Sequence, residues 1–186
     1  MTDYNKKISA RNIRVGEVRF SFVNVFAPRE NEDGTPGKYG VCLIIPKQDK
    51  TAVKLIEEAV AAAANAAGEK GIRLPANYKT PLRDGDTERP EDESFAGCWF
   101  INANAQNMPG VRVLQNGQVA EALDGEDFYS GCYGAASVNF FPYDQGGNQG
   151  VGCGLNNVIK TRDGERLSGR SAEEDFGDMS GGFPGT

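Results

Sequence analysis

Positive charge is concentrated near the N-terminus of a chain that is acidic overall. The 186 residues include 26 acidic and 20 basic side chains and no histidine, which gives a net charge of −6. Residues 1–29 nevertheless contain six basic residues against two acidic ones: Lys6, Lys7, Arg11, Arg14, Arg19 and Arg29 against Asp3 and Glu17. A cationic segment can bind phosphate groups through charge alone. Each of these side chains could equally be an ordinary solvated charge.

Further cations lie at a predicted hairpin and along later predicted strands, where they could extend the same surface. They are Lys38 beside Tyr39, Arg112, Lys160 and Arg162. Together with Arg14 and Arg19, these residues form the set that we expect to contact phosphates.

A strand predicted around Trp99 has one wet face and one dry face. Residues i and i+2 of a strand share a face. Phe100 therefore lies on the same face as Asn102 and Asn104, while Trp99 and Ile101 lie on the opposite face. We predict that Phe100 stacks on a nucleobase beside the two asparagines and that Trp99 and Ile101 pack in the core.

A second predicted strand places aromatic rings beside small residues. One face of this strand carries Tyr133, Ala135, Ser137, Asn139, Phe141 and Tyr143. The small side chains leave an open floor between the rings, where bases could stack at about 1–3 kcal/mol each. Asn139 could reach a base edge or a sugar. Aromatic residues in strands are often core residues, so packing in the core is the alternative.

The absence of histidine removes several classes of catalytic site. The chain can have no histidine general base, no Ser-His-Asp or Cys-His nucleophile and no histidine-ligated metal. Its four cysteines are far apart and include no C-x-x-C pair, so we expect free thiols in packed strands. They are Cys42, Cys98, Cys132 and Cys153. We therefore expect a protein that is not an enzyme and that needs no metal or cofactor.

Two further patterns resemble ligand-binding motifs but lack essential parts. The alternating carboxylates of Asp84-x-Asp86-x-Glu88 lack the glycine and the terminal glutamate of a calcium loop, so we expect a solvated acidic loop. A metal-dependent nuclease that uses these carboxylates is the enzymatic alternative. The alternating glycines of residues 150–154 lack the lysine and the helix of a phosphate loop, so we expect them to permit coiling of a strand.

The elements that must position these residues are mostly strands. Runs of β-branched and aromatic residues predict strands, and an alanine-rich segment predicts one helix. We expect strands at residues 13–26, 39–46, 95–105, 111–114, 126–143 and 151–162, a helix within 47–71 and a long exposed loop at 72–94. The 24 glycines favour tight turns and bent strands. The sequence therefore predicts a mainly β body of five or six strands with one inserted helix.

Composition divides the chain into a body and a tail. Residues 1–170 are long enough for one nucleic-acid-binding domain with a complete core. Residues 171–186 contain no basic residue and carry four acids, Glu173, Glu174, Asp175 and Asp178, with Phe176 among them. Such a segment buries too little apolar surface to fold, so we expect a disordered acidic tail. It could recruit protein partners, fold over a cationic groove, or only aid solubility.

Several segments, taken in order, resemble a known family. Tyr129-Ser130-Gly131-Cys132-Tyr133 runs into Asn139-Phe140-Phe141-Pro142-Tyr143, and Gly150-Val151-Gly152, Gly154-Leu155-Asn156-Asn157-Val158 and Asp163-Gly164-Glu165 follow. This order is similar to that of phage-encoded single-stranded DNA-binding proteins over most of residues 8–170. The resemblance implies an OB-fold, a five-stranded Greek-key barrel, here with one inserted α-helix and long loops. It also implies an acidic tail that contacts other replication proteins.

The resemblance implies a function as well. Such a protein coats unpaired strands in phage DNA replication or recombination, independently of sequence, through phosphate contacts and base stacking. Its partners would be single-stranded DNA, in some cases duplex DNA, and phage replication proteins that bind the tail. It would act in the cytoplasm of the infected bacterial host, and no apolar run here approaches the ~18 residues of a membrane span. A structural phage tail or head protein is the alternative.

Overall fold

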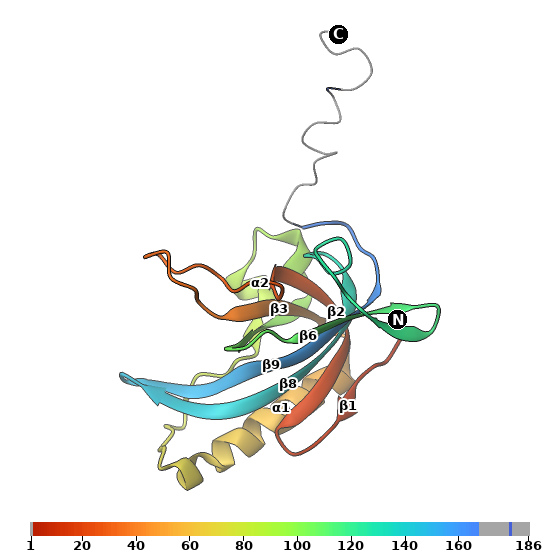
Figure 1. Ribbon diagram of the computed structural model, residues 1–186. Helices are drawn as coiled ribbons and strands as arrows, with labels where there is room; N and C mark the ends of the chain where they lie inside the picture. Colours follow the sequence, from red (N-terminus) through yellow and green to blue (C-terminus); the bar gives the residue numbers. More distant parts are fainter. Residues whose placement is uncertain (1, 168–178, 180–186) are drawn as a thin grey trace.

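Five strands close into a barrel at the centre of the protein (Figure 1). The computed structural model describes residues 2–167 and 179. The barrel strands are β2 (Asn12–Asn24), β3 (Tyr39–Pro46), β5 (Cys98–Ala105), β8 (Tyr133–Gln145) and β9 (Asn148–Arg162). They pair in the cyclic order β2, β3, β5, β9, β8, and β8 pairs again with β2. Within the barrel β5 and β9 run parallel and the other pairs antiparallel, which confirms the predicted OB-fold.

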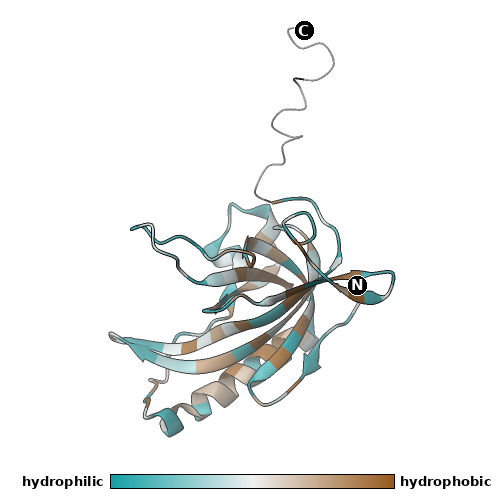
Figure 2. Ribbon diagram, viewed as in Figure 1, coloured by the Kyte–Doolittle hydropathy of each residue, from teal (hydrophilic) through white to brown (hydrophobic). Residues whose placement is uncertain are grey.

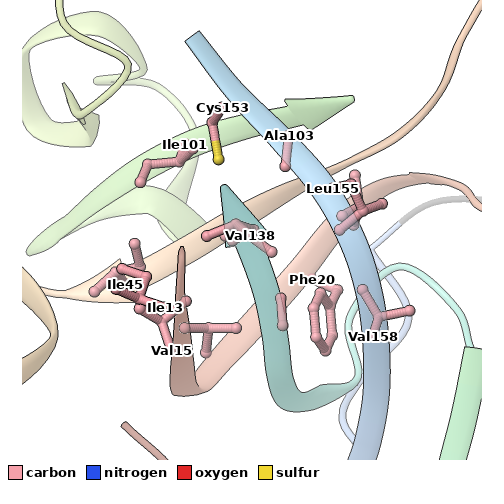
Figure 3. Packing of buried hydrophobic residues seen from close by; sticks show 14 of the residues in the cluster. Ile13, Val15, Phe20, Ile45, Ile101, Ala103, Val138, Cys153, Leu155 and Val158 are labelled. Atoms are coloured by element: carbon pink, nitrogen blue, oxygen red, sulfur yellow. The ribbon is translucent and has the colours of Figure 1, made fainter. Parts of the chain in front are cut away.

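Alternating side chains fill the barrel. β-Branched and aromatic residues favour strands because they pack well on a pleated surface, and every second one points inward. Figure 3 shows Ile13, Val15 and Phe20 of β2 packed near Val138 of β8 and Leu155 of β9, and all five are buried. Hydrophobic residues follow the barrel strands and the helix, whereas the hairpin tips are hydrophilic (Figure 2).

One long helix, α1 (Lys50–Asn65), is inserted between β3 and β5. The side chain of Asp49 caps it by accepting a hydrogen bond of 3.0 Å from the backbone N–H of Ala52, which satisfies a donor that has no partner within the helix. Its buried face packs against β2, β8 and β9 and consists of Ala52, Ile56, Ala59, Val60 and Ala63. The short helix η1 (Ala67–Lys70) follows and ends at Gly71, whose φ of 70° favours glycine.

Four further strands extend the barrel sheet, and one of them, the short β4 (Arg83–Asp84), pairs with β5. The hairpin of β6 (Gly110–Gln115) and β7 (Gln118–Glu121) continues the sheet beyond β9, and β1 (Lys6–Lys7) pairs with β2. Asn116 and Gly117 form the two-residue turn between β6 and β7, and both have positive φ, as such a hairpin turn requires.

The acidic segment before β5 is more ordered than predicted. It contains β4 (Arg83–Asp84), α2 (Gly85–Glu88) and η2 (Glu93–Phe95), and we call residues 84–97 the flap. The side chains of Asp84 and Asp92 cap the two short helices, and Phe95 is fully buried. The flap is held in place by Phe95, which packs against Cys42 and Ile44 of β3 and Phe100 of β5. A local sequence pattern does not reveal this tertiary contact, so it predicts a loop.

The predicted strand at residues 126–143 is wrong in its first part, because β8 begins only at Tyr133. Gly131 has a φ of 113°, which breaks the extended backbone. Before it, the Phe128 ring turns into the core and packs on the Phe20 ring, with centroids 4.7 Å apart.

The predicted tail, residues 171–186, lies outside the described residues except for Met179. Its disorder and its partner-binding residues therefore remain predictions. Among the described residues, no helix is long and apolar enough to cross a membrane.

Candidate nucleic-acid interface

Two hairpins stand on either side of an open groove. One is the β2–β3 connection, residues 25–38, and the other is the tip of β8–β9, which turns at Gly146-Gly147, and both project from the same side of the barrel in Figure 1. In OB-folds, the equivalent loops and the adjoining strand face bind oligonucleotides. The groove has a volume of about 540 Å³. Its lining includes Lys38, Lys79, Thr80, Pro81, Arg83, Asn102, Asn104, Gln106, Phe141, Tyr143, Gln145 and Gly152.

Residues 79–83 form a third wall of the groove, and the β8–β9 hairpin fixes this wall. The backbone N–H of Lys79 donates to the carbonyl of Gln149 at 3.1 Å, and the N–H of Val151 donates to the carbonyl of Lys79 at 2.9 Å. The Lys79 ammonium donates to the Asn148 side chain at 2.9 Å. Lys79 therefore stands at the mouth of the groove on a paired backbone.

The groove is positively charged although the chain is acidic. Lys38, Lys79 and Arg83 line it, and none of the described lining residues is acidic. Arg29, from the β2–β3 hairpin, donates a hydrogen bond to the side chain of Asn104 at the groove wall. Arg83 forms an ion pair with Glu88 of the flap, so Lys38, Lys79 and Arg29 carry most of the uncompensated charge. Such a groove attracts a polyanion.

Aromatic side chains of β8 lie over a stripe of glycines in β9. The register places Tyr143 opposite Gly150 and Phe141 opposite Gly152. A Cβ atom added at Gly152 would lie 2.8 Å from Cζ of Phe141, so the ring covers that glycine closely. The absence of a side chain at Gly152 lets the Phe141 ring lie against the strand and present its other side to the groove. A ring in this position can stack on a base.

The Gly152→Val variant tests this arrangement. We expect single-stranded DNA affinity to fall roughly tenfold because the added side chain displaces the Phe141 ring from its stacking position. Stability should change by less than about 1 kcal/mol, because the displaced group is the tip of a side chain rather than backbone. Thermal melting and a fluorescence titration measure the two effects. Unchanged affinity would show that the position of the ring does not matter.

Polar side chains continue the groove floor. Cross-strand pairing joins Asn104 of β5 to Gly154 of β9 and Gly154 to Asn139 of β8, so the two asparagines flank one glycine. Asn139 donates to the side chain of Asn156 at 2.8 Å. Asn102 is exposed on the same face of β5. The predicted faces of β8 and of the Asn102 side of β5 are thus confirmed, although their contacts with nucleic acid remain a prediction.

Phe100 does not reach the groove, contrary to the predicted stacking role. It is only 2% exposed, and its ring meets the Phe95 ring edge to face, with centroids 5.2 Å apart. The predicted face is correct, but the flap covers the outer face of β5 at this point. Ile101 is in the core as predicted, and Trp99 is partly buried against its edge.

Four other predicted contacts gather at the end of β8 away from the groove. The Tyr133 ring is contacted by the guanidinium groups of Arg162 and Arg19, whose central carbons lie 3.8 and 5.2 Å from its centroid. Arg162 forms an ion pair of 2.9 Å with the buried Glu17, and Lys160 forms one of 2.8 Å with Asp163. These four side chains do not line the groove, and they contact Glu17, Asp163 or one another. Their contact with nucleic acid remains a prediction.

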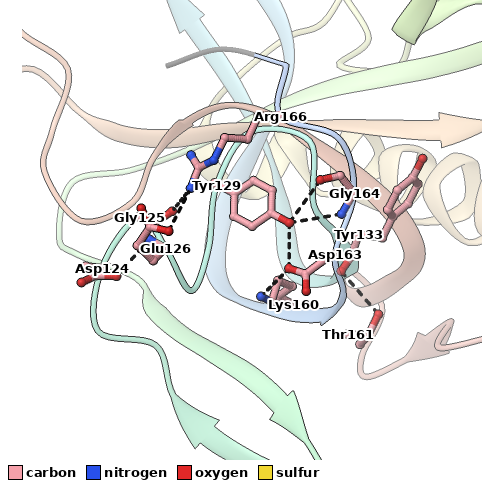
Figure 4. Close-up of polar contacts among 10 residues, drawn as sticks. All are labelled: Asp124, Gly125, Glu126, Tyr129, Tyr133, Lys160, Thr161, Asp163, Gly164 and Arg166. Atoms are coloured by element: carbon pink, nitrogen blue, oxygen red, sulfur yellow. Dashed lines mark hydrogen bonds and ion pairs between the residues drawn. The ribbon is translucent and has the colours of Figure 1, made fainter. Parts of the chain in front are cut away.

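A hydrogen-bond network anchors the chain after β9 (Figure 4). The hydroxyl of Tyr129 donates to Asp163 at 2.7 Å, and Lys160 reaches the same carboxylate. Burial, together with the hydrogen bond to Asp163, raises the pKa of Tyr129. The Arg166 guanidinium lies over the Tyr129 ring at 4.5 Å. The segment that leads toward the tail is therefore held against the barrel.

Three remaining predicted residues do not line the groove. Tyr39 is half-buried at the start of β3. Arg14 and Arg112 are exposed on the outer face, where Arg14 pairs in register with Ser137 of β8 and Arg112 with Ile159 of β9. Their contact with nucleic acid remains a prediction.

The acidic motif predicted to be solvated is instead ion-paired. Lys47 lies 2.7 Å from Asp84 and 2.8 Å from Asp86, and Glu88 pairs with Arg83. The hydrogen bonds that the Lys47 ammonium donates lower the pKa of both accepting aspartates, and the same bonds raise the pKa of Lys47. These ion pairs fasten the flap to the barrel. They account for the three carboxylates by a structural role, without the nuclease alternative.

The four cysteines are free thiols, as predicted. Cys42, Cys132 and Cys153 are buried and Cys98 is half-buried. Burial raises the pKa of Cys42 to about 12 and that of Cys132 to about 11, so these thiols remain protonated at neutral pH.

Sequence reasoning missed several groove residues. Lys79 and Arg83 lie in a segment predicted as irregular, and no local pattern places it against the β8–β9 hairpin. For the glycine stripe, the sequence pattern alone predicts only coiling of the strand. The sequence does contain a signal for the contact between Phe141 and these glycines. If two strands pair outward from a turn at Gly146-Gly147, Phe141 lies opposite Gly152.

Comparisons with known proteins agree with this architecture. Residues 11–182 match the model of a family described as "Enterobacter phage Enc34, ssDNA-binding protein". A curated relative, "Putative protein p50" of Acyrthosiphon pisum secondary endosymbiont phage 1, is 32% identical over 180 residues, which is 90% of this chain and 94% of the relative.

Solved structures share the fold. The single-stranded DNA-binding protein from bacteriophage Enc34 in complex with ssDNA superposes with a TM-score of 0.73 at 23% identity, covering 88% of this chain and 96% of that one. The single-stranded DNA-binding protein gp2.5 encoded by bacteriophage T7 gives a TM-score of 0.52 at 16% identity, covering 93% and 96%. With the family model matching most of its length, this chain belongs to the Enc34-type family of phage single-stranded DNA-binding proteins.

Proposed function

We propose that this protein holds single-stranded DNA in the groove between the β2–β3 and β8–β9 hairpins. Phosphates contact Arg29, Lys38 and Lys79, a base stacks on Phe141, and Asn102 and Asn104 contact sugars or base edges. The observation that carries the proposal is the groove itself, which is lined by cations and open aromatic rings and by no described acidic residue in a chain of net charge −6. These are the two requirements for binding a single strand.

The binding is independent of base sequence. Every base has a π-face that can stack on an aromatic ring, and the phosphates carry the same charge at every nucleotide. The protein therefore coats unpaired strands during phage DNA replication or recombination, in the cytoplasm of the infected bacterium, without catalysing a reaction. The similar protein from bacteriophage Enc34, whose structure is a complex with ssDNA, supports this assignment.

The acidic tail serves a second role in this proposal. Residues 171–186 carry four acids and Phe176, a composition that suits recruitment of phage replication proteins. Residues 1–170 then act as the DNA-binding domain and the tail as a separate recruitment segment. Duplex DNA also carries phosphates, so the charged groove attracts it, but paired bases cannot stack on Phe141 in the same way.

The double variant Lys38→Ala/Lys79→Ala tests the proposal. Binding to oligo-dT should weaken, and the slope of log affinity against log salt should become shallower by about 1.4, because each phosphate contact to a single strand contributes about 0.7. Fluorescence titration at several salt concentrations measures the slope, with duplex DNA of matched length for comparison.

The control variant Lys50→Ala/Lys54→Ala removes the same charge from α1, outside the groove. We expect this control to keep the slope of the unmodified protein. Equal slopes for all three proteins would place the phosphate contacts elsewhere, and no binding by the unmodified protein would reject the proposed function.

A further inference from the structure

We propose that Phe22 of β2 and Arg89 of the flap form a second base-binding position for single-stranded DNA, separate from Phe141 of β8. The proposal rests on the proposed function, because it extends the path of the same strand. Neither residue belongs to the lining of the groove.

Phe22 is presented to solvent by an unusual backbone. Pairing between β2 and β3 shifts between Ser21 and Asn24, so Phe22 and Val23 together face one residue of β3. Phe22 has a φ of 49°, which is rare for a bulky residue, and the side chain of Asn24 donates to its carbonyl at 3.1 Å. Val23 packs against the core while the ring of Phe22 is 51% exposed. Bulges that redirect a side chain and strained residues both occur preferentially at functional sites.

Arg89 supplies a positive charge beside this ring. Its guanidinium carbon lies 5.7 Å from the centroid of Phe22 and 5.6 Å from that of Phe100, so the buried aromatic cluster under the flap holds it in place. Among the described residues, Arg89 forms no ion pair, whereas Lys47 and Arg83 take up the acids that precede it in the flap. A fixed, unpaired guanidinium next to an exposed ring offers one contact to a phosphate and one to a base.

Strand pairing connects this position to the groove. Asn102 of β5 pairs with Cys42 of β3, and Cys42 pairs with Ser21 of β2, directly before Phe22. A line across the barrel surface from β8 to β2 passes over β9, β5 and β3. Neighbouring strands are about 4.8 Å apart, so these four strand-to-strand spacings span roughly 19 Å. The line from Asn102 to Ser21 runs over the buried Cys42, which packs with Phe95 and Phe100 under the flap. A strand that leaves Phe141 across the asparagines of β5 would therefore pass over Arg89 of the flap to reach Phe22.

Charge differs between the two ends of this path. Arg89 also lines a neighbouring cleft that contains Glu91, Asp92 and Glu93 of the flap. Glu165 is a fourth acid in this cleft, and Arg19 and Arg166 are further cations. Four acids against three cations leave the cleft close to neutral, so it attracts a polyanion less than the groove at Phe141 does.

The test compares Phe22→Ala with Phe141→Ala in titrations with a long oligo-dT. We expect Phe22→Ala to weaken binding roughly five- to tenfold, at the low end of the range for one stacked base because half of the ring is already covered. Leu123→Ala is the matched control, since Leu123 is 76% exposed outside this path, and it should bind normally. Melting curves verify that each variant is folded.

The variant Phe22→Trp gives a second, direct measurement. It should keep the affinity, and its indole fluorescence should be quenched by oligo-dT beyond the quenching seen with Trp99, the one native tryptophan. Normal affinity of Phe22→Ala together with no added quenching in Phe22→Trp would overturn the second position. If Phe141→Ala still weakens binding in that case, the proposed function stands without it.

Discussion

Replacing Phe141 by alanine should lower the affinity for single-stranded DNA by roughly 5- to 150-fold. This range corresponds to the loss of one stacked base, about 1–3 kcal/mol. The ring lies over Gly152 at the wall of the groove, so its removal takes away an apolar surface on which a base can stack. Titration with oligo-dT at fixed salt measures the change. Phe141→Trp should retain the affinity because it keeps a flat ring.

Tyr133→Ala is the matched control for this prediction, because Tyr133 is an aromatic residue on the same face of the same strand. Its ring is contacted by two guanidinium groups away from the groove. We therefore expect Tyr133→Ala to lose stability but to bind DNA normally when folded. The reverse result, with binding lost in Tyr133→Ala and kept in Phe141→Ala, would contradict the placement of the strand.

Replacing Gly134 by alanine should destabilise the fold by about 3 kcal/mol or more. Gly134 lies in β8 opposite Lys160 of β9, and an added Cβ atom would overlap the backbone carbonyl of Ile159. The overlapping group is backbone within the closed barrel, so it cannot move aside without breaking the β8–β9 pairing. For a chain of this size we expect the melting temperature to fall by about 6–12 °C.

Gly125→Ala provides the control for this second prediction. No atom lies within 4 Å of the Cβ position at Gly125, and its φ is not positive. Its stability should stay the same or rise slightly, because alanine restricts the unfolded chain. Equal melting temperatures for Gly134→Ala and the unmodified protein would show that the barrel is less tightly closed than the pairing indicates.

The elements of the barrel could largely be predicted from the sequence, because their signals are local. β-Branched runs give the strands, alanines give α1, and alternation gives the faces of β5 and β8. The order of pairing that closes the barrel came from the resemblance to a family. Local patterns alone do not state which strands become neighbours.

Two predicted aromatic residues lie outside the groove because other segments cover them. Phe100 lies on the predicted face, but Phe95 and Arg89 of the flap cover it. Tyr133 lies on the same face as Phe141, but Arg19 and Arg162 approach it from two other strands. Periodicity determines the face on which a residue lies, whereas exposure depends on tertiary contacts.

Photocrosslinking tests the central claim most directly. An oligonucleotide that carries iododeoxyuridine would be bound, irradiated and digested, and the modified residues identified by mass spectrometry. The claim that the strand lies between the two hairpins predicts adducts on Phe141 and Tyr143. Adducts confined to Tyr133, at the other end of β8, and to Tyr129, which precedes that strand, would contradict it.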